Sequence, residues 1–420
     1  MADRRPIAVA YDQGAVSPAE IAVGLAPLGP VVFLLPRSDH VDRLKPVLAR
    51  LGEVVLLGGK DDVARLRALR PKAVLTFSEN LMRETAALAE GLGLPGHTEE
   101  TAVLLTDKYR QRERLRAAGV DPVRSGFVPG PGDGHGVLRE VGLPAVVKPA
   151  QGQGSGSTFL VTDEEVGTKL IEELRDVSGG LVVEEFLTGR PSLPHGDYVS
   201  VETASRDGDV LPIAVTGKHP LWPPFREVGQ FWPVALEENE GAEVIALAVA
   251  AVRALGVRTG ICHTEIKLTV DGPRIIEVNG RLGGHLNELA RRSCGVDLVR
   301  TAGLLATGQP PPHGYLRPDT VHFQFNAQAP TVACTLHAVD GVDRVRDVPG
   351  IAGYRPYVRP GAALPGGVKT TSLDLLTGSA PDHAAMVGIL DEALSRISYT
   401  FEADGTFWSS TPTLSGVGWS

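Results

Sequence analysis

The sequence predicts an α/β and α+β protein of more than one domain, and three observations support this fold class. Its 420 residues exceed what a single hydrophobic core usually holds, which is about 250–300 residues. In the N-terminal quarter, short apolar segments alternate with helical stretches, which is typical of a parallel sheet. Beyond Pro310-Pro311-Pro312, short strands with Pro-Gly turns and one helical stretch predict a separate α+β unit.

The N-terminal strands are predicted where apolar runs lie between turn residues. They are Ile7 to Tyr11, Val31 to Leu35, Val54 to Leu57 and Ala73 to Phe77. A helix is predicted over Val41 to Leu51, with Pro46 kinking or delaying it. Open parallel sheets bind ligands beyond the carboxyl ends of their strands. The loops after Tyr11 and around Ser78-Glu79-Asn80 are therefore candidates for ligand contact.

The stretch from His263 to Arg281 predicts a β-hairpin, because polar and apolar residues alternate on both sides of a turn. The turn is Asp271-Gly272-Pro273. The face expected to be buried comprises Thr264, Ile266, Leu268, Val270, Ile276 and Val278. With an odd loop centred near Asp271, Glu265 falls opposite Glu277 on the other face.

Two carboxylates that face each other across paired strands repel unless a positive charge lies between them. With the amide of Asn279, Glu265 and Glu277 form an all-oxygen ligand set that suits Mg2+, which completes its shell with water and phosphates. The hairpin therefore predicts a magnesium site beside a nucleotide. The alternative is a solvated face on which Lys267 and Arg281 neutralise the acids.

A glycine-rich segment follows a predicted strand that ends in Lys148. The strand is Leu143 to Lys148, and the loop from Pro149 to Thr158 contains three glycines among small polar residues. Such a loop can turn its backbone N–H groups toward an anion and close over it. It lacks the Gly-Lys-Ser/Thr of a P-loop, and a flexible linker is the alternative interpretation.

Lys108 lies near the start of a predicted helix, in which Thr106 or Asp107 is the N-cap and Leu115 with Ala118 forms the inner stripe. A cation in the first turn of a helix is electrostatically unfavourable. A bound anion would account for Lys108, and a solvated lysine is the alternative.

A further apolar strand, Leu181 to Leu187, ends in two acids and Phe186, and it can supply the flat slot that an adenine ring needs. With the two lysines, the glycine-rich loop and the acidic hairpin, the chain from Thr106 to Gly308 resembles an ATP-grasp enzyme, the superfamily of D-alanine:D-alanine ligase and biotin carboxylase. The resemblance implies an ATP-grasp fold between a Rossmann-like parallel-sheet domain and a C-terminal α+β cap. The implied units are an N-terminal domain (1–105), a small subdomain with a lid (106–183), a large subdomain with the Mg2+ site (184–309) and a C-terminal subdomain (310–420).

The resemblance also implies roles for residues that match the family motifs. The nucleotide would be bound by Lys108, Lys148, Gln151, Gly154, Ser155, Gly156, Ser157, Glu184, Glu185, Phe186, Leu187 and Asp197. Asp197 would take the ribose hydroxyls, although Arg190 to His195 separate it further from the adenine strand than is usual in the family. Mg2+, or Mn2+ in its place, would be held by Glu265, Glu277 and Asn279, and Arg281 matches the arginine that binds an acyl phosphate or a substrate carboxylate.

Within the superfamily, the blocks Gly260 to Gly284 and Lys218 to Gln230 resemble those of the L-amino acid ligases, which join two amino acids. The resemblance gives Glu227 the role of holding a substrate ammonium group. Gln230 stands where a histidine is common, and His285 stands where some of these ligases carry a bulky aromatic residue. The candidate substrate contacts are His285, Gln230, Gly283 and Gly284.

Other conspicuous side chains also have a structural interpretation. Trp222, Phe225 and Trp232 are expected to pack in a core rather than touch a ligand. His263 alternates onto the same face as Glu265, so it either contacts the site or donates to a carboxylate as a satisfied buried histidine.

Composition excludes several classes of function. A net charge of -9 disfavours nucleic acid as a partner, because no basic face compensates it. No apolar run reaches the ~20 residues that a membrane span needs, and the N-terminus lacks the apolar core of a signal peptide. Cys262, Cys294 and Cys334 are widely spaced, which predicts reduced thiols in a cytoplasmic protein.

These inferences lead to the hypothesis of a cytoplasmic, magnesium-dependent, ADP-forming carboxylate-amine ligase with small, amino-acid-like substrates; the resemblance also allows a homodimer. ATP would phosphorylate one carboxylate, and the amine of a second substrate would displace phosphate from the acyl phosphate. One alternative is a biotin-carboxylase-like enzyme that activates bicarbonate, although the chain contains no Ala-Met-Lys-Met biotin-attachment sequence. The other is a non-catalytic nucleotide-binding sensor.

Overall fold

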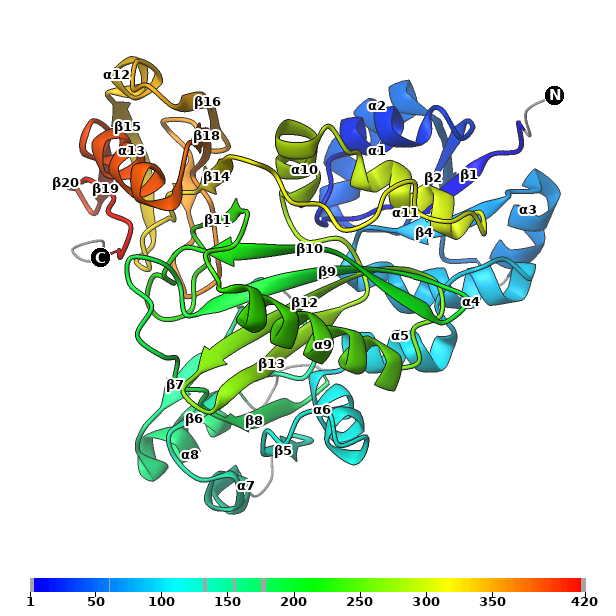
Figure 1. Cartoon of the computed structure of the whole chain (residues 1–420), viewed down its shortest axis with the longest axis horizontal. Helices are drawn as coiled ribbons and strands as arrows, with labels where there is room; N and C mark the ends of the chain where they lie inside the picture. The colour runs from blue at the N-terminus through cyan, green and yellow to red at the C-terminus, as the bar shows by residue number, and fades with distance from the viewer. Residues whose placement is uncertain are drawn as a thin grey trace.

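A computed structural model of the chain describes residues 4–59, 61–130, 134–152, 154, 156–174 and 179–416. Within these residues the strands form four β-sheets (Figure 1). The N-terminal and C-terminal parts form two lobes on one side of a central sheet, and the small sheet lies on the other side (Figure 1).

The N-terminal sheet is parallel, as the sequence predicts, and its strand order is β3-β2-β1-β4. Its strands are β1 (Ile7–Ala10), β2 (Val31–Leu35), β3 (Glu53–Leu56) and β4 (Ala73–Thr76). The helices beside it are α1 (Pro18–Leu25), α2 (Asp39–Leu51), α3 (Asp62–Leu69), the 3-10 helix η1 (Glu79–Leu81) and α4 (Met82–Leu92). Ser17 and Glu20 form a capping box at the start of α1, so the local sequence fixes where this helix begins.

The small sheet is antiparallel, with the order β5-β8-β6-β7. Its strands are β5 (Ser125–Val128), β6 (Ala145–Pro149), β7 (Phe159–Val161) and β8 (Leu181–Glu185), and its helices are α7 (Gly134–Val141) and α8 (Glu164–Glu173). Helices α5 (Glu99–Thr106) and α6 (Lys108–Ala117) precede it. Asp107 caps α6, but the predicted inner position of Ala118 is wrong: this residue is exposed, because α6 ends at Ala117 and its buried face is formed by Gln111, Arg112 and Leu115.

The large sheet has the order β13-β12-β9-β10-β11-β14-β18-β16 and is antiparallel throughout. Its strands are β9 (Tyr198–Arg206), β10 (Asp209–Lys218), β11 (Gly229–Trp232), β12 (Gly260–Thr269), β13 (Gly272–Asn279), β14 (Val321–Phe325), β16 (Ile351–Pro356) and β18 (Asp374–Ala380). Helix α9 (Glu238–Ala254) packs on β9, β10, β12 and β13, and α10 (Leu286–Cys294) and α11 (Leu298–Ala306) follow the hairpin.

The C-terminal subdomain adds a sheet with the order β17-β15-β19-β20. Its elements are β15 (Cys334–Asp340), α12 (Val342–Arg346), β17 (Ala363–Leu364), α13 (His383–Ser395), β19 (Ser398–Ala403) and β20 (Thr406–Ser410). The four predicted domain ranges stay predictions, although β8 crosses the predicted boundary at 183 and the large sheet continues past residue 309.

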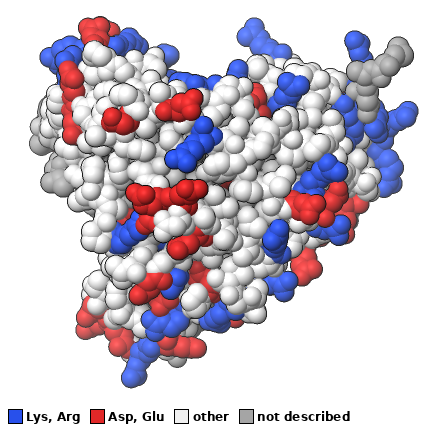
Figure 2. All heavy atoms as spheres, in the orientation of Figure 1, with Lys and Arg blue, Asp and Glu red and all other residues white. Residues whose placement is uncertain are grey.

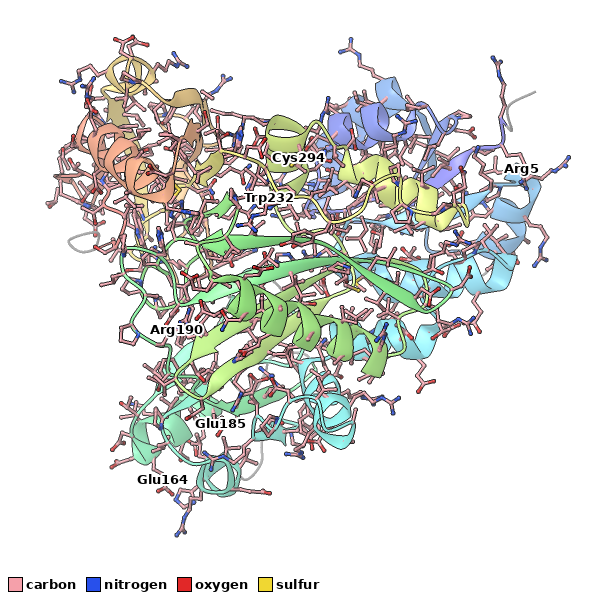
Figure 3. The ribbon with its side chains drawn as sticks, viewed as in Figure 1. Arg5, Glu164, Glu185, Arg190, Trp232 and Cys294 are labelled. Atoms are coloured by element: carbon pink, nitrogen blue, oxygen red, sulfur yellow. The ribbon has the colours of Figure 1, made fainter. Side chains whose placement is uncertain are left out.

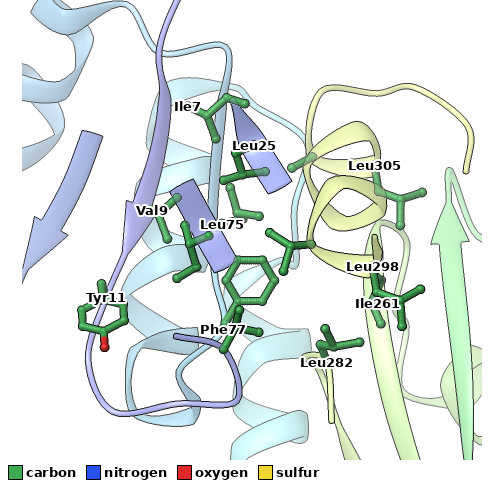
Figure 4. Packing of buried hydrophobic residues seen from close by; sticks show 14 of the residues in the cluster. Ile7, Val9, Tyr11, Leu25, Leu75, Phe77, Ile261, Leu282, Leu298 and Leu305 are labelled. Carbon is green, nitrogen blue, oxygen red and sulfur yellow. The ribbon is translucent and has the colours of Figure 1, made fainter. Parts of the chain in front are cut away.

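One hydrophobic core joins the N-terminal sheet to the large sheet (Figure 4). Val9 and Leu75 of the N-terminal sheet belong to the same buried cluster as Leu298 and Leu305 of α11 and Ile261 of β12. Burying each of these side chains stabilises the fold by roughly 1.5–3 kcal/mol. The shared core therefore fixes the loops that follow β1 and β4 beside the large sheet.

The β12–β13 hairpin has the predicted register, in which Glu265 pairs with Glu277. The predicted alternation is wrong at Ile276, because a bulge pairs Ile266 directly with Ile275. Ile275 is fully buried, whereas Ile276 faces the cavity described below. Val270 is also wrongly placed: it lies in the turn and is 78% exposed.

Three features of the structure bear on the expectations drawn from composition: the surface charges, the length and apolarity of the helices, and the cysteine thiols. Acidic and basic side chains are interspersed on the face shown in Figure 2. None of the described helices is both long and apolar enough to cross a membrane. Cys262, Cys294 and Cys334 are free thiols.

A substitution at Gly229 tests how closely β11 and β14 pack in the large sheet. Its φ is +140° and a Cβ there would lie 2.1 Å from the carbonyl oxygen of Gln324 on β14. We expect Gly229→Ala to lower the free energy of unfolding by about 2–4 kcal/mol, measured by urea denaturation. Gly388→Ala in α13 is the matched control, since its Cβ would meet nothing within 4 Å, and it should be neutral or stabilise by up to ~1 kcal/mol. Equal midpoints for the two variants would contradict the prediction.

Candidate active site

A cavity of about 470 Å³ lies where the small sheet, the large sheet and both lobes meet. This volume is in the range of ordinary ligand pockets, about 300–1,000 Å³. The predicted site residues that line it are Lys108, Lys148, Gln151, Gly154, Gly156, Glu184, Glu185, Phe186, Leu187, Glu227, Gln230, Glu265, Glu277, Asn279, Arg281, Gly284 and His285. Residues separated by up to 177 positions, from Lys108 to His285, are thus brought to one place.

Three further predicted residues, Gly283, Asp197 and Ser157, do not line this cavity. Gly283 lies behind it, where a Cβ would come within 2.5 Å of the His263 ring. The Asp197 carboxylate accepts a hydrogen bond of 2.7 Å from Lys267, and it is Lys267 that reaches the cavity. Ser157 has a left-handed backbone (φ +56°) and is also absent from the lining. Ser155 lies outside the described residues.

Two lysines face the cavity from the small-sheet side. Lys148 is the second-last residue of β6, and its Nζ lies 2.9 Å from a carboxylate oxygen of Glu184. Lys108 opens α6, and its Nζ lies 2.9 Å from Glu277 and donates to the carbonyl of Gly152 at 2.7 Å. Burial lowers the pKa of Lys108, but the carboxylates of Glu277, Glu79 and Glu184 together outweigh burial and raise it. Both predicted lysines therefore present positive charge between the glycine-rich loop and the acidic hairpin.

Arg112 is a residue that the sequence analysis missed. Its guanidinium donates to the carbonyls of Ile275 and Ile276 at 2.6 and 2.8 Å and to Glu184 at 3.2 Å. Burial alone would raise the pKa of Glu184, yet Arg112 and Lys148 lower it to about 2. The available signal was its position, one helical turn after Lys108 and hence on the same face of α6.

The predicted adenine strand ends in two acids with different environments. One carboxylate oxygen of Glu184, Oε1, is buried and has no hydrogen-bond partner among the described residues. The Glu185 carboxylate instead accepts a hydrogen bond of 2.8 Å from Arg124, at the small sheet (Figure 3). The ring of Phe186 lies 6.4 Å from that of Phe225, which lines the cavity rather than the core. The expected core packing holds for Trp222 and Trp232, which are 0% and 1% exposed.

The acidic hairpin presents the side-chain oxygens of Glu265, Glu277 and Asn279 to the cavity, together with His263 and Lys267. Asn279 Oδ1 accepts a hydrogen bond of 3.3 Å from Arg281, and Glu265 lies 3.4 Å from Nε2 of His263. Burial raises the pKa of Glu265, but His263 lowers it overall, so the carboxylate is ionised. In the described part of the chain, no group of three His, Cys, Asp or Glu side chains is placed to hold a metal ion. Two carboxylates and one amide fit Mg2+, which takes its other ligands from water and phosphate.

His263 lies between two carboxylates. Its Nδ1 contacts Glu202, which is fully buried on β9, while its Nε2 faces Glu265. Burial lowers the pKa of His263, but the adjacent Glu202 carboxylate raises it above the usual value. His263 is thus a buried histidine that contacts a carboxylate and also lines the cavity, so its role at the site stays a prediction; Glu202 is the partner that the sequence did not identify.

Both predicted N-terminal loops reach the site. Gln13, Gly14 and Ala15, which follow β1, line the cavity. Glu79 in η1 is buried, and its carboxylate lies 3.0 Å from Nε of Arg281. Arg281 is thereby held at the junction of the hairpin and the N-terminal domain.

The far end of the cavity is polar. Nζ of Lys218 lies 3.7 Å from Glu227 and donates to Gln230 at 3.3 Å. Gln230 in turn donates to the carbonyl of Gly284 and to the side chain of Gln324, both at 3.0 Å. The ring of His285 stacks on Tyr357, with centroids 5.8 Å apart. Lys218 and Gln324 have no role in the sequence analysis, because only the large sheet brings β10 and β14 to this end.

Comparison with known proteins finds one family model that matches the part of the chain holding most of this site. Residues 106–285 match the model of the ATP-grasp domain. Alanine–anticapsin ligase from Bacillus subtilis (strain 168) is 27% identical over 373 residues, which cover 80% of this chain and 75% of that protein.

Solved structures extend the likeness over nearly the whole fold. The L-amino acid ligase from Bacillus licheniformis superposes with a TM-score of 0.75 at 21% identity, covering 94% of this chain and 98% of that one. The biotin carboxylase domain of the Hydrogenobacter thermophilus 2-oxoglutarate carboxylase has a TM-score of 0.69 at 17% identity, covering 98% and 93%. At these identities the likeness establishes the fold alone.

Residues 106–285 thus match an ATP-grasp domain and the chain has the ATP-grasp fold, so the resemblance drawn from its motifs is confirmed. Its relatives include an alanine–anticapsin ligase, and its structural neighbours include an L-amino acid ligase.

Replacing Arg112 tests the buried charge cluster formed by Arg112, Lys148 and Glu184. Arg112→Met leaves Glu184 with one cationic partner and removes the guanidinium donor from two carbonyls of β13. We expect the free energy of unfolding to fall by ~3–5 kcal/mol in urea denaturation. Arg114→Met, on the exposed side of the same helix, loses one hydrogen bond to Ala254 and should cost no more than ~1 kcal/mol. A loss in Arg112→Met as small as the control's would refute the role assigned to the cluster.

Proposed function

We propose that this protein is an ATP-dependent, ADP-forming ligase that joins the carboxylate of one amino acid or amino-acid-like substrate to the amine of another. The observation that carries the proposal is the arrangement of charge in one cavity. Lys108 and Lys148 lie on its nucleotide side, Glu265 and Glu277 form its acidic hairpin, and Glu227 stands at its far end. A single cavity can therefore hold a triphosphate and a zwitterionic substrate next to each other.

The nucleotide would lie between the glycine-rich loop and the hairpin. Phe186 and Leu187 offer an apolar wall for the base, and Oε1 of Glu184 is a buried acceptor without a partner. Lys108 and Lys148 neutralise charge on the phosphates, which is the main task of a protein in phosphoryl transfer. The alanine–anticapsin ligase and the L-amino acid ligase support this choice of reaction class.

Glu265, Glu277 and Asn279 would hold Mg2+, which supplies charge neutralisation for the transferred phosphoryl group when bound. The biotin carboxylase neighbour was solved with MgADP, which supports this metal and nucleotide. Mn2+ prefers similar oxygen ligands and would be an alternative. In the structure Lys108 pairs with Glu277, so its ammonium group already balances part of the hairpin charge.

The substrate carboxylate would lie near Arg281, which Glu79 and Asn279 orient. Activation joins that carboxylate to the transferred phosphoryl group as an acyl phosphate, and ADP leaves. The amine of the second substrate then forms the C–N bond, loses a proton and displaces phosphate. Glu227 is a suitable partner for a substrate ammonium group, because it lines the cavity and its contact with Lys218 is as long as 3.7 Å.

A bicarbonate-activating enzyme is the second candidate, and one comparison favours it: the biotin carboxylase neighbour was solved with bicarbonate. The polar far end, with Glu227 and Gln230, favours a larger substrate that carries an ammonium group. A non-catalytic sensor would not need Arg281, Glu265 and Glu277 in the same cavity. Location in the cytoplasm and assembly as a homodimer stay predictions.

The proposal is tested by phosphate release from MgATP across single amino acids, pairs of amino acids and bicarbonate, with mass spectrometry of each positive reaction. We expect release that requires amino acids and a product lighter than the summed substrates by one water. Release with bicarbonate alone would favour the second candidate. Nucleotide binding without turnover in any reaction would favour the sensor.

The metal assignment is tested by Glu277→Gln, which removes a ligand charge and keeps the shape of the side chain. We expect phosphate release to fall by at least ~100-fold, about 2.7 kcal/mol in activation free energy, while the circular dichroism spectrum is retained. The exposed Glu243→Gln on α9 is the control for loss of one carboxylate. Turnover of Glu277→Gln at the wild-type rate would remove the basis for this metal site.

A further inference from the structure

A loop of the C-terminal subdomain enters the nucleotide side of the cavity. It connects β17 to β18, and Lys369, Thr370 and Ser372 from it line the cavity. The backbone N–H of Thr370 donates to the carbonyl of Gly154 at 3.1 Å. Lys369 lies alongside, since a Cβ on Gly154 would be 3.8 Å from its Cε. The C-terminal subdomain therefore contacts the glycine-rich loop at the place where the phosphates would lie.

Lys369 differs from the other cations of the cavity in having no counter-ion. The lining residues Lys108, Arg112, Lys148, Lys218, Lys267 and Arg281 each lie 2.7–3.7 Å from a carboxylate oxygen. No carboxylate in the described part of the chain pairs with Lys369. Lys369 lines the cavity and is exposed, so its charge is available to an anion that binds beside the glycine-rich loop.

The neighbouring hydroxyl points to the same kind of ligand. Thr370 Oγ1 is buried and lacks a hydrogen-bond partner among the described residues, although the residue lines the cavity. Leaving a buried hydroxyl unsatisfied costs roughly 1–3 kcal/mol, which a ligand oxygen would recover. A free ammonium group and a free hydroxyl beside a glycine-rich backbone form a site for an oxyanion.

We propose that Lys369, with the hydroxyl of Thr370, binds the terminal phosphate of ATP and is a further catalytic residue of this enzyme. This inference rests on the proposed function, because it requires the triphosphate to lie between the glycine-rich loop and the acidic hairpin. Lys369 would stabilise negative charge on the phosphoryl group during transfer and change no covalent bond itself. The C-terminal subdomain thereby completes the nucleotide site.

The test compares Lys369→Met with Lys369→Arg, which keeps the charge, and with Lys169→Met, an exposed lysine on α8. The readouts are kcat and KM for ATP in phosphate release, and calorimetric affinities for MgADP and for the magnesium complex of the β,γ-imido analogue of ATP. We expect Lys369→Met to lower kcat/KM for ATP by about 10–100-fold. Its affinity for the analogue should fall more than its affinity for ADP, and Lys369→Arg should retain most of both.

A second variant keeps the inference testable if Lys369→Met does not fold. Thr370→Val removes the hydroxyl at nearly constant volume and should weaken binding of the analogue by about 3–10-fold. Unchanged analogue affinity in both variants, or a loss confined to KM for an amino acid, would overturn the inference while leaving the ligase proposal intact. If the wild-type protein binds the analogue but ligates nothing, the proposed function fails, and the binding measurements still decide the role of Lys369.

Discussion

The site depends on one electrostatic constraint: the register of the β12–β13 hairpin fixes Glu265 and Glu277 face to face. Paired strands hold these two carboxylates close, and like charges at that spacing destabilise a sheet unless cations balance them. Lys108 approaches Glu277 from α6, and His263 lies beside Glu265 on the same strand. The residues around the hairpin thus supply the charged side chains that balance its two carboxylates.

A second group of buried charged residues, Arg112, Lys148 and Glu184, fixes the position of the charges around the hairpin. Arg112 and Lys148 converge on Glu184, and the same guanidinium donates to carbonyls of β13. This network ties α6, the small sheet and the hairpin together in a largely buried region, where solvent screens the charges little. Breaking such a buried pair is costly, because the remaining charge loses its partner in a medium of low polarity. The geometry of the phosphate side is therefore coupled to the packing of α6.

The two lobes are attached to the large sheet in different ways. The N-terminal sheet is anchored by the apolar core that it shares with α11 and β12, and this anchor places Glu79 beside Arg281. The C-terminal subdomain is joined by the pairing of β11 with β14, which delivers Gln324 to the far end of the cavity, and by a second apolar core that contains Phe231 and Leu336. A loop from the same subdomain reaches Gly154. Each wall is held by interactions that lie away from the cavity itself.

The sequence by itself determined the parallel N-terminal sheet, the cap of α6, the register of Glu265 with Glu277 and the candidate lysines. These features depend on short-range periodicity and motif spacing, which a single segment carries. Only the tertiary structure decided the bulge that turns Ile276 into the cavity, the burial of Arg112, the contact of Glu202 with His263 and the approach of Lys369. These follow from contacts between segments distant in the chain, where packing and charge compensation choose the partner and no local pattern records it.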